Sequence, residues 1–144
     1  MTQHLINALL ASRAFGIAAR ILLTLVFWSS GLAKLFDFAA AVAEMEKYGV
    51  TPAFPMAIAV IVVQLGGSAL VISGRYVWLG AGALGVFTAL TIPVAHAFWT
   101  MTGETAFFEM LFAIEHISVI GGLMTVAILR RQAAVGAKPG FAGV

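Results

Sequence analysis

The sequence predicts an all-α integral membrane protein, a bundle of four transmembrane helices with both termini in the cytoplasm. Of its 144 residues, 62% are hydrophobic and only 10% are charged, whereas soluble domains carry about 25% charged residues. The mean hydropathy is +1.05. Long apolar stretches alternate with short polar breaks, and arginine is unevenly distributed among those breaks. A water-soluble globular fold is therefore excluded.

The composition also excludes several functions and kinds of chemistry. The net charge is only +2 and no basic stripe is present, so the chain is not expected to bind nucleic acid. It has no cysteine, which excludes disulfides, thiol catalysis, cysteine-ligated zinc and iron–sulfur clusters. Signatures of soluble enzymes, such as a phosphate-binding glycine loop, HExxH or GxSxG, are absent. No catalytic residue can be assigned, and whether the chain is an enzyme stays open.

The first predicted span, residues 15–36, contains an apolar run with a positive charge at each end, Arg20 and Lys34. In a helix these two residues share a face with Thr24, Phe27 and Gly31. The charges are roughly 21 Å apart along the axis, somewhat less than the ~30 Å hydrocarbon thickness. The segment is therefore expected to span the membrane with one marked face. Residues 1–13 are expected to form a short interfacial helix.

The remaining spans follow in order. Residues 37–48 are expected to form an amphipathic helix on the membrane, followed by a turn at residues 51–55. The second and third spans are joined by a very short break at residues 73–76, so they form an antiparallel hairpin. Gly80, Gly82 and Gly85 are expected to allow close helix packing, and Pro93 to kink the third span. The second, third and fourth spans are predicted at residues 55–73, 77–98 and 107–129. Residues 130–144 are expected to form a loosely ordered tail, and the whole chain, residues 1–144, is expected to be a single domain.

Positive charges near the span ends predict the orientation. One end carries all five arginines, Arg13, Arg20, Arg75, Arg130 and Arg131; we call it the arginine end, and it is expected to be cytoplasmic. The opposite end, called the outer end, carries Lys34, Lys47 and most of the acidic residues. Three tryptophans lie near span ends, as in an aromatic belt.

A few polar side chains fall within the spans or at their ends, where a central charged one costs roughly 2.5–3.5 kcal/mol. On the fourth span, the face that carries Glu115 continues through Ser118 and Gly122, so we expect it to point into the bundle. The outer half of the bundle is then predicted to collect a candidate site made of Lys34, His96, Glu115 and His116.

Two interpretations of this site remain open. In the functional one, a small amphipathic ligand such as a quinone binds there, and the four side chains contact it or relay protons. In the structural one, Glu115 pairs with Lys34 or with a histidine and holds the helices together.

The other polar residues are interpreted as structural. Arg20 is expected to reach the cytoplasmic surface or a lipid phosphate, and Gln64 to hydrogen-bond another helix. The loop carboxylates, including Glu44, are expected to be solvated. Neither haem nor a metal is expected, because His96 lies near the end of its span and His116 about two and a half turns inside the next.

Motifs along the chain resemble those of the DoxX family. They are the SGLAKL motif at residues 30–35, YGVTP at 48–52, QLGGSALVISGR at 64–75, AHAFW at 95–99 and FEMLFAIEHISVIGGL at 108–123. The likeness extends over residues 20–128. It implies a four-helix membrane protein, some of whose relatives resemble a subunit of a thiosulfate:quinone oxidoreductase or belong to membrane redox assemblies.

The leading hypothesis is a small subunit of a quinone-linked redox assembly in a bacterial inner membrane, which anchors a partner and binds quinone in its outer half. Its expected partners are membrane lipid and either a membrane or peripheral redox protein or further copies of the chain. The alternatives are a non-catalytic scaffold and, with less support from four short spans, a small-solute transporter.

Overall fold

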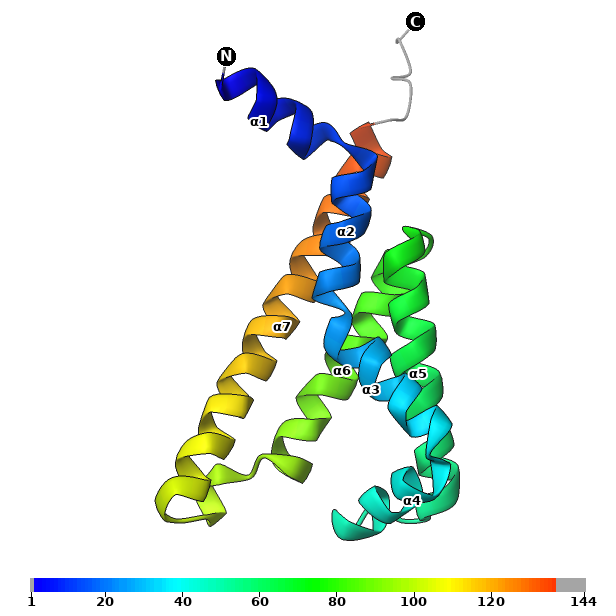
Figure 1. The fold of residues 1–144 in the computed structure, drawn as a ribbon, viewed down its shortest axis with the longest axis vertical. Helices are drawn as coiled ribbons and strands as arrows, with labels where there is room; N and C mark the ends of the chain where they lie inside the picture. Colours follow the sequence, from blue (N-terminus) through cyan, green and yellow to red (C-terminus); the bar gives the residue numbers. More distant parts are fainter. Residues whose placement is uncertain (1, 137–144) are drawn as a thin grey trace, which may run out of the picture.

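The computed structural model describes residues 2–136, and these are helical with short breaks (Figure 1). The predicted all-α membrane bundle is confirmed. The elements are α1 (Thr2–Ala11), α2 (Arg13–Leu23), α3 (Leu25–Phe36), α4 (Phe38–Lys47), α5 (Ala53–Ser73), α6 (Val77–Ala95), the 3₁₀ helix η1 (Phe98–Thr100) and α7 (Gly103–Gly136).

Helices α5, α6 with η1, and α7 are each long and apolar enough to cross a membrane. The predicted first span is present as two shorter helices, α2 and α3, which follow one another across Thr24 (Figure 1). The Thr24 hydroxyl is fully buried and donates a hydrogen bond to Arg20 O at 2.8 Å. Such a bond from threonine to the preceding turn often bends a helix, and it coincides with the break, although Thr24 N also donates to Arg20 O.

Sharp bends separate the short helices α1 and α4 from the helices next to them in the chain. The chain turns by 65° between α1 and α2, and by 110° between α3 and α4. At the second bend the Asp37 carboxylate accepts a hydrogen bond from Ala40 N, which caps α4. Ala41 and Met45 of α4 are buried with Ala57 of α5. The predicted helix after the first span therefore folds back and covers the outer end of α5.

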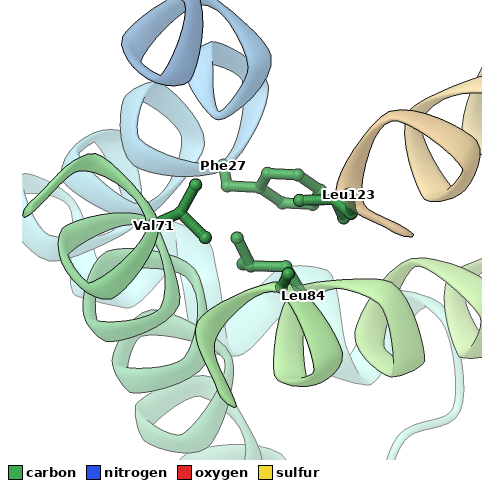
Figure 2. Packing of buried hydrophobic residues seen from close by; sticks show 5 residues of the cluster. Phe27, Val71, Leu84 and Leu123 are labelled. Carbon is green, nitrogen blue, oxygen red and sulfur yellow. The ribbon is translucent and has the colours of Figure 1, made fainter. Parts of the chain in front are cut away.

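The core lies where four elements meet. Phe27 of α3, Val71 of α5, Leu84 of α6 and Leu123 of α7 point toward one another (Figure 2). Because lipid tails are as apolar as these side chains, close packing rather than the hydrophobic effect holds such helices together in a membrane. The core thus fixes the relative positions of the helices that carry the polar residues.

Glycine permits close approach of α5 and α6. Of the three predicted positions, Gly80, Gly82 and Gly85, only Gly80 has this role. A Cβ at Gly80 would lie 2.6 Å from Gly67 O and 2.8 Å from Leu70 Cβ. A Cβ at Gly82 or Gly85 would meet nothing within 4 Å. Of these three glycines, only Gly80 is therefore at the helix crossing, because steps of two and five residues turn a position roughly 160° and 140° away from it around the helix.

Two spans end differently from the prediction. Helix α6 ends at Ala95, two residues after Pro93, instead of continuing as a kinked helix to residue 98. Proline interferes with the helical hydrogen bonds, and His96 follows with non-helical backbone angles. Helix α7 continues to Gly136, beyond the predicted end at Leu129. Of the predicted loose tail, residues 130–136 are helical, and residues 137–144 lie outside the described part.

The crossing at Gly80 can be tested by adding volume there. Gly80→Val should lower the free energy of unfolding by about 1–3 kcal/mol, the usual cost of overpacking. Gly82→Val adds the same side chain to the same helix where space is open, and should be tolerated. Unfolding in mixed micelles followed by circular dichroism measures both. Equal destabilisation by the two variants would contradict the crossing.

Candidate functional site: two polar clusters at the outer end

The first polar cluster joins α3, α4 and α5; we call it the Lys34 cluster. Lys34 Nζ lies 2.8 Å from Glu44 Oε2 and donates a hydrogen bond to Ser30 Oγ at 3.1 Å. From α5, Gln64 Nε2 donates to the same hydroxyl at 3.3 Å. The Lys34 side chain is only 14% exposed, against 41% for Glu44. Glu44 is therefore still partly solvated, as expected, but it also pairs with Lys34, because the 110° bend after α3 returns α4 toward that side chain.

Close backbone packing places Gln64 in this cluster. A Cβ at Gly31 would lie 2.8 Å from Leu65 Cδ2 and 3.2 Å from Gln64 Cβ, so α3 and α5 touch at this point. Gln64 and Ser68 are almost fully buried. Within the described residues, Gln64 Oε1 and Ser68 Oγ have no hydrogen-bond partner. The expected helix-to-helix hydrogen bond of Gln64 is present through its amide nitrogen, while its carbonyl oxygen can still accept.

The second polar cluster lies between the end of α6 and the first half of α7; we call it the His96 cluster. His96 Nδ1 lies 2.6 Å from Glu109 Oε2, and both side chains are about three-quarters or more buried, at 19% and 24% exposure. The His96 and His116 rings are 4.6 Å apart between centroids. Glu109 and His116 are seven residues apart on α7 and share a face, so both reach His96.

Hydrogen bonds fix the proton on one of these rings. His116 Nδ1 lies 2.7 Å from Phe112 O. A carbonyl oxygen can only accept, so His116 Nδ1 donates and its Nε2 is an acceptor in the neutral ring. His96 Nδ1 shares a proton with the Glu109 carboxylate, which leaves its own Nε2 for another partner. The cluster can therefore hold a proton and pass it to a bound group.

The structure divides the predicted site. Lys34 belongs to the first cluster, and His96 and His116 to the second. In the part of the chain that the structure describes, no hydrogen bond or ion pair joins the two. The predicted difference in depth between the histidines is not seen. Helix α6 ends after Pro93, and the chain then brings His96 beside α7. Within residues 2–136, no three histidine, aspartate or glutamate side chains are arranged so that they could hold one metal ion.

Glu115 lies outside both clusters. Its side chain is exposed, as are Leu111, Ser118 and Thr125 on the same face of α7. The expectation that this face points into the bundle is wrong except at Gly122, where a Cβ would lie 2.8 Å from Leu23 Cδ1 of α2. Only Ala113 and Leu123 of α7 are buried, so the bundle covers the opposite side of the helix. Glu115 therefore projects from the surface of the membrane-crossing part of α7.

Three residues of these clusters were not among the predicted site residues: Ser30, Glu44 and Glu109. Ser30 was recognisable, because it precedes Lys34 by one helical turn. Glu109 shares the face of His116, and this spacing was visible in the sequence. Glu44 could be found only with the bend between α3 and α4. The spacing of polar residues along a helix could therefore have identified Ser30 and Glu109 from the sequence, but not Glu44.

The fold and these clusters define an integral membrane protein with several spans, in which polar side chains inside the bundle pair across helices. Comparison with known proteins agrees with this class. The family model described as DoxX matches residues 16–97, more than half of the chain, and the protein belongs to the DoxX family. The Lys34 cluster lies within the matched region, whereas Glu109, Glu115 and His116 lie beyond it.

A curated relative supports the same assignment. The inner membrane protein YphA of Escherichia coli K12 is 26% identical over 110 residues, which cover 76% of this chain and 79% of the relative. The prediction of a multi-pass inner membrane protein is confirmed. No solved structure matches the chain.

The Lys34–Glu44 pair can be measured with a double-mutant cycle. Lys34→Met and Glu44→Gln should show a coupling energy of about 1 kcal/mol in unfolding experiments, because the pair is only partly shielded from solvent. Glu46 lies on the same helix without this ion pair, so Lys34→Met with Glu46→Gln should be additive. A coupling as large for Glu46 as for Glu44 would contradict the specific pairing.

Proposed function

We propose that this protein is a small membrane subunit of a quinone-linked redox assembly, in which the His96 cluster exchanges protons with a quinone head group. The observation that carries the proposal is the 2.6 Å contact between His96 and Glu109 beside the His116 ring. A carboxylate and two imidazoles in one partly buried cluster are groups that can accept and donate protons.

The chemistry of a quinone fits this arrangement. Reduction of a quinone to a quinol adds two electrons and two protons, one proton to each carbonyl oxygen. His96, or His116 beside it, would as the imidazolium ion give one proton from Nε2 to the carbonyl oxygen that faces the cluster. Glu109 would orient His96 and return to it a proton taken from water at the outer end, and that water would protonate the carbonyl oxygen on the far side of the quinone ring. Since the chain has no cysteine and thus no thiol couple of its own, the electrons would come from a redox partner. The apolar surroundings of the bundle suit the isoprenoid tail.

This proposal can be tested at Glu109. Glu109→Gln should lower quinone-dependent electron transfer at least about ten-fold, because general acid–base groups contribute roughly 10²–10⁴-fold. Glu104→Gln removes the same charge from the first turn of α7, outside the cluster, and should leave the rate unchanged. The assay uses the assembly extracted gently from its own membrane, with decylubiquinone as acceptor, over a range of pH.

Native mass spectrometry of the same extract gives a second readout, the mass of any bound quinone. Full activity of Glu109→Gln together with an extract free of quinone would refute the proposal. An unchanged pH profile in Glu109→Gln would remove the carboxylate from the proton path.

The exposed face of α7 favours a second function, the anchoring of a partner. A carboxylate inside the membrane-crossing part costs free energy unless it is paired, and Glu115 is exposed on that face. Ser118 and Gly121 lie near it along the exposed side, and small or hydroxyl side chains allow another helix to approach. A non-catalytic scaffold would need this face and not the His96 cluster.

Glu115→Leu should therefore release a partner while leaving the subunit folded, because leucine is well tolerated by lipid. The expected result in native mass spectrometry is loss of the mass of a second copy or of another membrane chain. Glu104→Leu serves as the control, since it removes an acidic residue near the helix start. An assembly that keeps its mass with Glu115→Leu would exclude docking through this face.

A further inference from the structure

Charge is separated between the two ends of the bundle. All six acidic residues of the sequence lie between positions 37 and 115, in or beside α4 and in the first half of α7. All five arginines lie before or after that interval or in the turn between α5 and α6. Both ion pairs in the described residues are at the outer end. The arginine end thus has no acidic side chain of this chain to balance it.

Two guanidinium groups converge at the turn between α5 and α6. Arg20 Nη1 donates to Val71 O at 3.4 Å, and Arg130 Nη2 donates to Gly74 O at 2.8 Å. A Cβ at Gly74 would collide with Arg20 Nη1 and lie 3.4 Å from Arg130 Nη2, so both groups lie against this glycine. Two like charges so close together raise the local positive potential. Each guanidinium also has further N–H donors that these carbonyls do not use.

An open cleft lies beside Arg130, one of these two arginines. It has a volume of about 560 Å³ and lies between the start of α6 and the end of α7. Arg130 and Arg131 line one side, and Gly74, Tyr76 and Trp78 line the other. Tyrosine and tryptophan are the residues that proteins place at the level of lipid head groups. The cleft is therefore a basic site at the expected height of the membrane interface.

An apolar groove begins at the same tryptophan. It has a volume of about 520 Å³ and lies between α5 and α6, with Trp78, Gly82, Val86 and Leu90 on the α6 side. From Trp78 to Leu90 the groove extends roughly 18 Å along α6, a little more than half of the ~30 Å hydrocarbon layer. Its length suits an acyl chain from one leaflet.

We propose that the arginine end binds an anionic phospholipid, with its phosphate in the cleft beside Arg130 and Arg131 and one acyl chain in the groove below Trp78. Arginine forms paired hydrogen bonds with phosphate oxygens, and basic pockets between membrane helices suit anionic head groups. A free phosphate ion satisfies the cleft but not the groove, so the lipid is the assigned ligand. The site is at the opposite end from the His96 cluster and independent of the proposed function.

Quenching of Trp78 fluorescence tests the proposal. Trp28→Phe and Trp99→Phe leave Trp78 as the sole tryptophan of the full chain, which is reconstituted in phosphatidylcholine vesicles with a rising share of phosphatidylglycerol brominated on its acyl chains. Quenching should saturate at a low share of this lipid, and brominated phosphatidylcholine should quench only in proportion to its amount.

Matched substitutions separate the site from general surface charge. Arg131→Gln should require roughly a five-fold higher share of phosphatidylglycerol for half-quenching, as expected for one basic residue at an anionic surface. Arg75→Gln removes the same charge at the same end outside the cleft, and should leave the half-quenching share unchanged. Equal shifts for the two variants would overturn the cleft as the site.

The groove has its own control. Gly82→Leu fills open space in the groove. It should raise the share of phosphatidylglycerol needed for half-quenching roughly four-fold, as expected when one methylene of the acyl chain is displaced. Gly66→Leu adds the same side chain to open space outside the groove and should have no effect. Equal quenching by both brominated lipids, or full displacement of phosphatidylglycerol by inorganic phosphate, would overturn the lipid assignment. Unchanged unfolding temperatures of the variants in detergent verify that each remains folded.

Discussion

The inability of the membrane interior to hydrate polar groups is the constraint on which the rest of this structure depends. Inside the bundle it produces pairing between elements: Lys34 of α3 with Glu44 of α4, Gln64 of α5 with Ser30 of α3, and His96 with Glu109 of α7. Hydroxyl side chains that lack such partners return to their own helix, as Thr24 and Thr88 do. Each pairing determines which helix faces can meet, and the polar clusters and the packing of the bundle are therefore inseparable.

Most of the fold could be predicted because its main signals are local. Apolar runs of the right length mark α5, α6 and α7, the short break at Gly74 makes an antiparallel hairpin, and Asp37 begins a separate helix after α3. The features that escaped prediction depend on neighbours. The break at Thr24 coincides with a hydroxyl bond to Arg20 O, but Thr88 makes the same kind of bond inside the unbroken α6, so the threonine alone does not predict the break.

The candidate site was predicted less well for the same reason. Sequence periodicity shows which residues of a helix share a face, but it does not show which face the neighbouring helices cover. On α7 the covered side carries Ala113 and Leu123, and the exposed side carries Glu115. A polar face therefore has two explanations, pairing within the bundle or pairing with another molecule. Lys34 illustrates the first, whereas Glu115 is left uncovered by the bundle, and only the arrangement of the helices distinguishes the two positions.

The family match and the geometry together separate the roles of the two clusters. Residues 16–97 include the Lys34 cluster and His96, so a property shared through the DoxX match can reach these residues but not Glu109 or His116. The polar contacts of the Lys34 cluster join α3, α4 and α5. Among the described residues, its Gln64 Oε1 atom has no hydrogen-bond partner. The His96 cluster instead leaves the Nε2 atoms of two adjoining rings for other partners. The proposed proton exchange is therefore assigned to the His96 cluster, while the polar contacts of the Lys34 cluster join α3, α4 and α5.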